Sequence, residues 1–364
     1  MPRYAVIGSG MMGQEHIRNI NLLGKSVTAV ADPNEAMRTG AAELAGNGCL
    51  AFADYKDLLS ANVADCLLIA SPNHTHFDVL NDTLSTNLPI LVEKPLCTTL
   101  DHCKSVLSKA ENRPAPTWVA MEYRYIPPVA RLIERALSGD LGKLRMLSIR
   151  EHRFPFLDKV GHWNRFAEQS GGTLVEKCCH FFDLMRLISQ SEPVRVFASG
   201  GQDVNHLDMK IDGRVPDVID NAYVVVEFEN SMRAMLDLCM FAEGSYWQEQ
   251  IVATGDKAEM AAHVPGPARF WPGHEERESE VIFSPREPKG PVVEMVDVDL
   301  NVLQAGDHHG STYYQHQKFS QLVESGNGQP EVTLKDGFIA VAIGLAAEQS
   351  IREQRPVNIA DVMT

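Results

Sequence analysis

A short segment at residues 171–186, GGTLVEKCCHFFDLMR, holds a glutamate, a lysine, two cysteines, a histidine and an aspartate within eight positions. Such side chains can bind a metal, transfer protons, or simply pack a helix. If residues 173–188 form one helix, about 100° per residue places Glu176, His180 and Asp183 on one face. Cys178 then points nearly the opposite way, and adjacent cysteines diverge too far to chelate one ion together with His180. The spacing therefore favours a proton-transfer site with packing cysteines over a metal site.

Two side chains supply the chemistry of proton removal from a hydroxyl group. The ordinary pKa of histidine, about 6.5, suits His180 to act as a general base, and a structural core histidine is the alternative. Lys94 follows the apolar run PILV, where a charge is costly unless it has an anionic partner or a task. Lys94 would bind the same oxygen and stabilise its developing negative charge. The alternative is an exposed Glu93–Lys94 pair. We expect Glu176 to orient or tune the catalytic pair.

The sequence GSGMMG at residues 8–13 follows an apolar run and opens a helical pattern. Gly8 permits a tight turn, Gly10 lets a pyrophosphate approach the backbone, and Gly13 allows close packing of helix on strand. Free N–H groups at the helix start then hold the phosphates. Asp32 ends the next strand, 19 residues beyond Gly13, where a carboxylate accepts from ribose hydroxyls and repels a 2′-phosphate. The pattern predicts NAD rather than NADP, although Arg38 could soften that preference, and a ligand-free glycine turn is the alternative.

A second turn, SPNHTH at residues 71–76, follows a strand at the end where doubly wound sheets bind ligands. Its two histidines invite a metal interpretation, but no cysteine or acidic third ligand lies nearby, so cap and turn residues are favoured. We predict no metal site. The predicted cofactor contacts are Gly8, Gly10, Met11, Met12, Gly13, Asp32, Ser71, Pro72, Asn73, His76, Glu93 and Lys94.

The elements that must position these residues change character along the chain. Apolar runs at 3–8, 26–32, 64–70, 89–95 and 117–121 alternate with helical patterns, which predicts a doubly wound parallel sheet. After Tyr125 the pattern predicts a mainly antiparallel sheet with helices. The expected strands of this part are 143–153, 221–230, 231–241 and 247–255, and its expected helices are 126–139, 312–325 and 333–354. Residues 264–292 are expected to be mostly loop or sheet edge.

Taken in order, the motifs GSGMMG, SPNHTH, EKP and the GG-to-HFFD block resemble those of the Gfo/Idh/MocA oxidoreductases, over about 190 residues. This resemblance implies an N-terminal Rossmann domain at 1–122. It also implies a C-terminal α+β domain at 123–364 with a large open, mainly antiparallel sheet, whose closing helices pack back near the cleft. The implied activity is NAD-dependent oxidation of a hydroxyl of a sugar, inositol or related polyol. Homodimers or homotetramers formed through the open sheet are implied as well.

Individual site residues follow from the same resemblance. Lys94 matches the lysine of EKP, His180 the catalytic histidine, and Asp183 a substrate-contacting aspartate. Where the family usually has an aspartate four residues before the histidine, this chain has Glu176, followed by Lys177, and either could take its role. The expected substrate contacts are Lys94, Arg124, Trp163, Asn164, Lys177, His180, Asp183 and His309. A metal held by Glu151, His152, His308 and His309 is an open alternative.

Composition narrows the function classes. The 364 residues include 33 basic and 48 acidic side chains, and the net charge of −15 opposes binding to nucleic acid or an anionic membrane. No stretch approaches the roughly 20 apolar residues needed to span a bilayer, and MPRYAVIGSG carries no export signal. The seven cysteines indicate reduced thiols in a cytoplasmic protein.

Two other functions fit parts of the pattern. A glycosidase or lyase of the same family would use the same residues and oxidise the sugar only transiently. A non-catalytic sensor would bind the dinucleotide and regulate a partner. Lys94 and His180 argue against the sensor, because it has no need of an acid–base pair.

Overall fold

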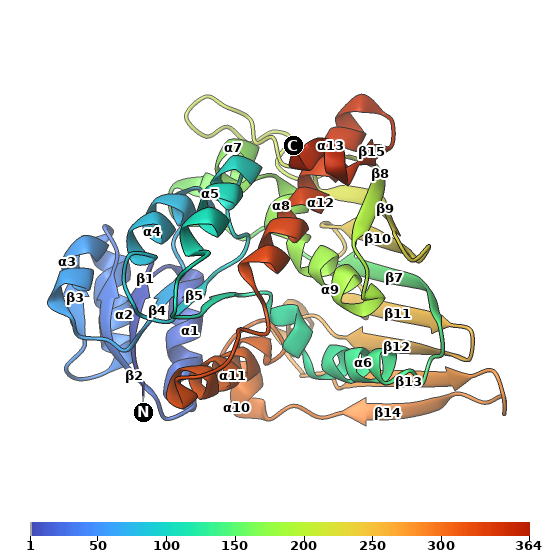
Figure 1. The fold of residues 1–364 in the computed structure, drawn as a ribbon, viewed down its shortest axis with the longest axis horizontal. Helices are drawn as coiled ribbons and strands as arrows, with labels where there is room; N and C mark the ends of the chain where they lie inside the picture. The colour runs from blue at the N-terminus through green and yellow to red at the C-terminus, as the bar shows by residue number, and fades with distance from the viewer. Residues whose placement is uncertain (1) are drawn as a thin grey trace.

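A six-stranded parallel sheet forms the first half of the molecule in the computed structural model, which describes residues 2–364 (Figure 1). Its strand order, β3-β2-β1-β4-β5-β6, confirms the predicted doubly wound sheet. Strand β3 was not predicted, because its apolar run, Leu50–Phe52, is short and largely exposed. The strands are β1 (Arg3–Ile7), β2 (Ser26–Ala31), β3 (Leu50–Phe52), β4 (Cys66–Ile69), β5 (Ile90–Val92) and β6 (Thr117–Val119).

Helices cover both faces of this sheet, and the order of the strands reverses between β1 and β4. Side chains of Asn34, Asp54 and Thr99 cap three of the helices by accepting backbone N–H groups. Ligands of such sheets bind beyond the carboxyl ends of the strands, at the point of reversal. The helical segments are α1 (Met11–Leu22), α2 (Glu35–Ala45), α3 (Tyr55–Ala61), η1 (Asn73–Thr75), α4 (His76–Thr83) and α5 (Leu100–Ala110).

A nine-stranded sheet, in the order β14-β13-β12-β11-β7-β10-β9-β8-β15, forms the second half. Only β7 and β10 pair in parallel, so the prediction of a mainly antiparallel sheet is confirmed. The expectation of mostly loop at 264–292 is wrong for β13, which lies between two other strands; charged neighbours hid its alternation. The strands are β7 (Leu144–His152), β8 (Pro193–Gly201), β9 (Asn221–Phe228), β10 (Arg233–Cys239), β11 (Glu249–Gly255), β12 (Ala258–Val264), β13 (Ser279–Pro285), β14 (Val292–Val296) and β15 (Val357–Asn358).

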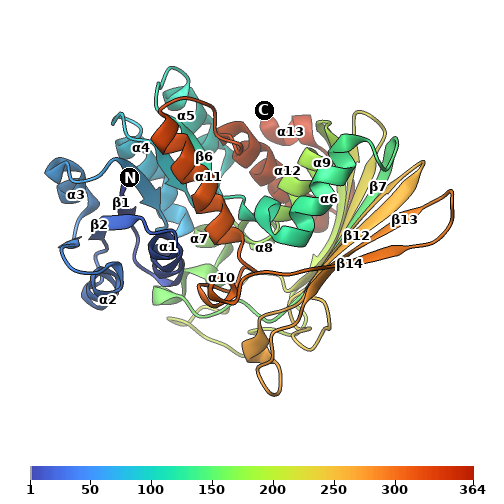
Figure 2. The ribbon, with the colours of Figure 1, turned by 90° about the horizontal axis from the view of Figure 1, so that it is seen from below.

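Helices α6 (Pro127–Ser138), α9 (Cys179–Ser189) and α12 (Leu334–Glu353) lie on one face of the second sheet and leave the other face open (Figure 2). Helix α12 also contacts α5 and β6, and α11 (Ser311–Ser325) packs on α1, so the closing helices join the two halves. Gly344 of α12 permits this packing, since a Cβ there would lie 2.7 Å from the carbonyl oxygen of Leu174.

The predicted single helix at 173–188 is wrong. It is divided into α8 (Thr173–Glu176) and α9, because Cys178 N–H bonds the carbonyl of Thr173 five residues back. The carbonyl of Glu176 does not accept from the next turn of the helix. It accepts instead from the ammonium of Lys94 at 3.1 Å and from the thiol of Cys179 at 3.6 Å. Breaks of this kind are frequent at functional sites.

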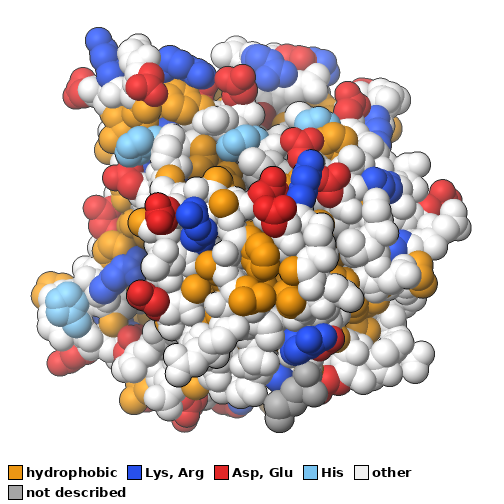
Figure 3. All heavy atoms as spheres, turned by 90° about the vertical axis from the view of Figure 1, so that its left-hand side faces the viewer, with side chains coloured by type: hydrophobic (Ala, Val, Ile, Leu, Met, Phe, Trp, Pro, Cys, Tyr) orange, Lys and Arg blue, Asp and Glu red, His pale blue; other side chains and the backbone are white. Residues whose placement is uncertain are grey.

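The remaining short elements connect these parts. They are η2 (Glu122–Tyr125), η3 (Val160–Arg165), α7 (Ala167–Ser170), η4 (Ala268–Phe270), α10 (Leu300–Gln304) and α13 (Ile359–Met363). All seven cysteines are free thiols. Within residues 2–364, no helix is both long enough and apolar enough to cross a membrane. Acidic and basic side chains are interspersed on the face formed by the first domain (Figure 3).

Candidate functional site

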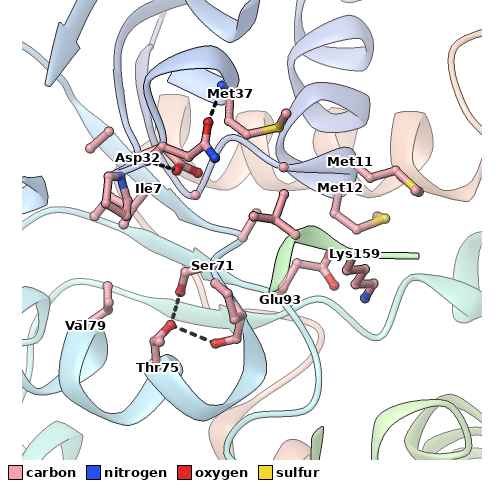
Figure 4. A pocket seen from close by; sticks show the side chains of 18 of the residues that line it. Ile7, Met11, Met12, Asp32, Met37, Ser71, Thr75, Val79, Glu93 and Lys159 are labelled. Atoms are coloured by element: carbon pink, nitrogen blue, oxygen red, sulfur yellow. Dashed lines mark hydrogen bonds between the residues drawn. The ribbon is translucent and has the colours of Figure 1, made fainter. Parts of the chain in front are cut away.

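A cavity of about 810 Å³ lies at the carboxyl ends of the parallel strands, within the roughly 300–1,000 Å³ range of small-molecule sites. Asp32 and Met37 lie toward one end, and Glu93 and Lys159 toward the other (Figure 4). Of the predicted cofactor contacts, Gly13 and His76 do not line it. Those that do are Gly8, Gly10, Met11, Met12, Asp32, Ser71, Pro72, Asn73, Glu93 and Lys94.

The glycine turn is shaped to hold a phosphate group. Gly8 has φ +94°, and a Cβ there would lie 2.4 Å from the backbone nitrogen of Ser71. A Cβ on Gly13 would lie 2.1 Å from the carbonyl oxygen of Gly8, so Gly13 acts by packing, not by contact with a ligand. A Cβ on Gly10 would meet nothing within 4 Å. No side chain caps α1 at Gly10, so first-turn N–H groups are free to bind an anion.

Asp32 is held at the far end of the cavity by two backbone groups. One carboxylate oxygen accepts from Ser9 N–H and the other from Asn34 N–H, each at 2.8 Å. Each oxygen retains a lone pair for a ribose hydroxyl. Arg38 does not line the cavity; its guanidinium donates to the carbonyl of Pro33 at 3.1 Å. These residues fit the adenosine end of NAD.

His76 acts as a positioning residue beneath the cavity. Its Nδ1 lies 2.8 Å from the carbonyl oxygen of Pro95, and its Nε2 lies 3.0 Å from that of Ser71. The ring is fully buried. His76 thus links the 71–76 turn to the segment after β5, and its direct contact with the cofactor stays a prediction.

Lys94 is not part of an exposed pair with Glu93. Glu93 is buried; one of its oxygens lies 2.9 Å from His16 Nε2, and the other accepts from the backbone N–H of Lys94. Burial alone would lower the pKa of Lys94, but Cys179 and the carboxylates of Glu176 and Glu93 raise it overall. The ammonium donates one hydrogen bond, to the carbonyl of Glu176, which leaves two N–H groups for a ligand.

His180 is a buried, neutral imidazole. Its ring stacks on Tyr123 with 4.2 Å between ring centres and 12° between planes, and its Nδ1 has no hydrogen-bond partner. Burial, followed by the positive charges of Lys94 and Lys177, holds the pKa of His180 well below 6.5. The imidazole is therefore free to accept a proton at neutral pH.

Glu176 and Lys177 occupy different environments on either side of the helix break. Glu176 Oε1 accepts from Lys159 Nζ at 3.1 Å, while its buried Oε2 has no partner. Lys177 Nζ donates to the hydroxyl of Tyr123 at 2.5 Å and lies 2.9 Å from Glu151. The carboxylate of Glu176 and the ammonium of Lys177 thus both have partners other than His180.

Several predicted substrate contacts are engaged elsewhere. Arg124 and Asp183 form a buried bidentate pair, with N···O distances of 2.6 and 2.5 Å. Asn164 is fully buried and donates to the carbonyl of Leu157. Trp163 does line the cavity, beneath the ammonium of Lys159 at 4.5 Å from its ring centre. His309 lies in a second cavity. Arg124, Asp183 and Asn164 line neither cavity, and direct substrate contact by them stays a prediction.

The structure also separates the residues of the alternative metal site. Glu151 pairs with Lys177, His152 lies 3.1 Å from Asp237, and His308 lies 2.7 Å from Glu15. Across residues 2–364, no cluster of three or more histidine, cysteine or acidic side chains is arranged to hold a metal.

The sequence reasoning missed Tyr123, and it placed His308 in the alternative metal site. Tyr123 follows β6 just as Lys94 follows β5, so its position at a strand end was the available signal. Burial would lower the pKa of His308, but Glu15 and Glu122 raise it to about 9. His308 is therefore a cation near Tyr123, and nothing in its local sequence shows that.

Two family models match this chain. Residues 2–121 match an NAD-binding Rossmann fold, and residues 133–359 match a C-terminal alpha/beta domain, both of one oxidoreductase family. Together they cover most of the chain and confirm NAD as the cofactor of the first domain.

Individual relatives agree with this assignment. The rhizopine catabolism protein MocA of Rhizobium meliloti is 32% identical over 194 residues, 52% of this chain and 58% of that protein, so the chain spans less than two thirds of it. The myo-inositol 2-dehydrogenase of Thermotoga maritima is 26% identical over 99% of both chains. The solved structure of levoglucosan dehydrogenase with NADH has a TM-score of 0.81 at 16% identity, covers 98% of each chain and shows the same fold.

Proposed function

Because this chain belongs to the Gfo/Idh/MocA oxidoreductase family, we propose that it is an NAD-dependent dehydrogenase oxidising a hydroxyl of a sugar, inositol or related polyol. One observation carries the proposal: Lys94, an ammonium with free N–H groups, lines the nucleotide cavity, and the neutral imidazole of His180 is buried close enough for the charge of Lys94 to lower its pKa. That pair matches the needs of a reaction that removes a proton from an alcohol.

The cofactor contacts follow from the cavity wall. The glycine turn and the uncapped start of α1 hold the pyrophosphate, and Asp32 holds the adenosine ribose. When bound, NAD supplies a nicotinamide ring that takes a hydride from the substrate carbon. Lys159 and Trp163, from the second domain, cover the end of the cavity near Lys94 and limit the access of water.

The proton leaves through this chain's own residues. Lys94 donates to the substrate hydroxyl oxygen, which lowers the cost of negative charge on it. His180 accepts the hydroxyl proton at an imidazole nitrogen. Glu176 holds the Lys94 ammonium through its carbonyl oxygen, and its unpaired Oε2 is placed to accept from a neighbouring hydroxyl.

Charge balance supports an uncharged substrate. The cations around Lys94 already have carboxylate partners, so the site offers no free positive charge for an acidic or phosphorylated sugar other than Lys94 itself. These pairs are Lys159 with Glu176, Lys177 with Glu151, and His308 with Glu15.

NADH formation with a panel of hexoses, inositols and other polyols tests the proposal. Lys94→Met should lower kcat by about 10²–10³-fold, the value of one strong electrostatic contact. His180→Ala should lower it by about 10²–10⁴-fold, the value of a general base. His180→Ala should bind NAD as wild type does in calorimetry, and Lys104→Met on α5 is the matched control for Lys94→Met. No turnover by NAD-loaded protein with any of these compounds would contradict the proposal.

A glycosidase or lyase that oxidises the sugar transiently is the second candidate. The unpartnered Oε2 of Glu176 favours it, since a buried carboxylate near Lys94 can carry a further proton. Glycoside cleavage without accumulation of NADH would distinguish this activity from a dehydrogenase. A purely regulatory dinucleotide sensor has less support, because Lys94 and His180 would then have no task.

The open face of the second sheet supports assembly of a homodimer or homotetramer. It exposes large apolar side chains, among them Tyr223 at 62% exposure, Phe197 and Met235. A second copy of the same sheet would cover them, as expected for a symmetric interface. Light scattering coupled to size exclusion tests this, and Tyr223→Glu with Met235→Glu should shift the protein to the monomer.

A further inference from the structure

A second cavity, of about 600 Å³, lies beside the nucleotide cavity. Residues of α1, of the 265–276 loop and of the 303–309 segment line it. The side chain of Met11 lines both cavities. Leu157 lines the second cavity, and the next residue, Asp158, lines the first. The two cavities are therefore neighbours that share part of one wall.

The second cavity also lies close to the proposed general base. Asp307 and His309 line it, while His308 between them reaches inward and bonds Glu15, another lining residue, at 2.7 Å. The ring centre of His308 lies 6.5 Å from that of Tyr123, which stacks on His180. About two side-chain rings thus separate the cavity from the imidazole of His180.

The polar groups of this cavity include two that have no partner. His309 has a buried Nε2 with no hydrogen bond, and its backbone adopts φ +48°. Burial lowers the pKa of His309 to about 4, so the ring is neutral and offers both a donor and an acceptor. Glu276 forms no hydrogen bond or ion pair with the rest of residues 2–364; burial and Asp307 raise its pKa.

The other charged side chains of the same wall are already paired. Arg269 pairs with Asp307, and Arg18 donates to the carbonyl of Ala305 at 2.9 Å. Met11, Leu157 and other apolar side chains complete the lining. A wall of mixed polar and apolar groups, two of them unpaired, suits the hydroxyls and CH faces of a sugar ring.

We propose that this second cavity is a subsite for a sugar ring joined to the ring that is oxidised, so that the enzyme accepts glycosides and not only single rings. His309 and Glu276 each bond a hydroxyl of that distal ring. The substrate bridges the two cavities past Met11. This inference rests on the proposed function, because it names the substrate class of the same site.

The test compares single rings with linked rings on the full-length, NAD-loaded protein. The probes are myo-inositol and D-glucose against galactinol, cellobiose and lactose, measured by NADH formation and by calorimetric binding. His309→Leu and Glu276→Leu should each lower the ratio of linked-ring to single-ring kcat/KM by about five- to tenfold, the value of one neutral hydrogen bond. The matched controls are His274→Leu, whose φ is +53°, and Glu275→Leu, neither of which lines the cavity.

The possible outcomes separate this subsite from the dehydrogenase proposal. Binding of a linked ring that weakens in the His309 and Glu276 variants, and not in the controls, supports the subsite even if no NADH forms. Oxidation of single rings without binding of any linked ring overturns it while leaving the dehydrogenase intact. Equal losses for single and linked rings also overturn it, because these residues would then serve the reacting ring or the fold.

Discussion

The pH dependence of turnover is the most direct test of the environment of His180. Oxidation of an alcohol needs neutral His180, so kcat/KM falls as the pH drops through its pKa. Burial, Lys94 and Lys177 hold that pKa well below 6.5. We therefore expect kcat/KM to stay level as the pH falls to 6.5 and to drop only below it. Lys177→Met should move this acid limb upward, because it removes a positive charge that disfavours the imidazolium.

The size of the movement follows from the geometry. The ammonium of Lys177 lies 4.6 Å from the centre of the Tyr123 ring, and the centre of the His180 ring lies 4.2 Å from the same point. The two groups are thus at most about 9 Å apart. At an effective dielectric constant of about 20, a unit charge at about 9 Å shifts a pKa by about 1.3. The acid limb should rise by about one pH unit.

The assay is kcat/KM for the best polyol substrate between pH 4.5 and 9, with circular dichroism to show that each variant is folded. Glu151→Gln removes the carboxylate that faces Lys177 and should move the acid limb the opposite way. Glu249 accepts a hydrogen bond from Tyr123, and burial raises its pKa to about 7. If the titration of Glu249 causes part of the pH dependence of kcat/KM, that part should disappear in Glu249→Gln. A wild-type limb at or above 6.5, or no movement in Lys177→Met, would refute the reasoning.

Three further predictions concern the cofactor and the fold. Gly13→Ala should abolish tight NAD binding in calorimetry, because its Cβ meets a carbonyl oxygen at 2.1 Å, whereas Gly40→Ala in α2 should leave binding unchanged and stabilise the protein by about 0.5–1 kcal/mol. Asp32→Ala should lower the ratio of NAD to NADP kcat/KM by about tenfold, since the repulsion of a 2′-phosphate is lost; an unchanged ratio would remove Asp32 from cofactor choice. Arg124→Gln should cost about 3–5 kcal/mol in urea unfolding, because it leaves Asp183 buried without its partner. A raised KM with unchanged stability would show instead that Arg124 binds substrate.

The nucleotide half of the protein could be predicted almost entirely from its sequence. Strands buried on both faces, the GSGMMG turn and Asp32 each follow local rules of period, glycine geometry and strand ends. The conformation of these segments does not depend on distant residues. The doubly wound sheet therefore agrees with the prediction, and most of the predicted cofactor contacts line the cavity. Strand β3 was not predicted, because three largely exposed residues are too few to show a hydrophobic pattern typical of a strand.

The catalytic half depended on contacts between distant segments. Helical period alone placed Glu176, His180 and Asp183 on one continuous face. In the folded protein that helix is divided after Glu176, whose carbonyl oxygen accepts from the ammonium of Lys94, 82 residues away. In the folded protein Asp183 also forms an ion pair with Arg124, and His180 is buried against the ring of Tyr123.

The sequence by itself determined which residue types were available and where the cofactor is expected to bind, because turns and strand ends are set by neighbours in the chain. Only the tertiary structure decided which charges are paired, how far the pKa of His180 falls, and that His309 lies in a cavity of its own. Ion pairing, burial and cavities depend on contacts between residues that are distant in the sequence, and local residue spacing does not predict those contacts.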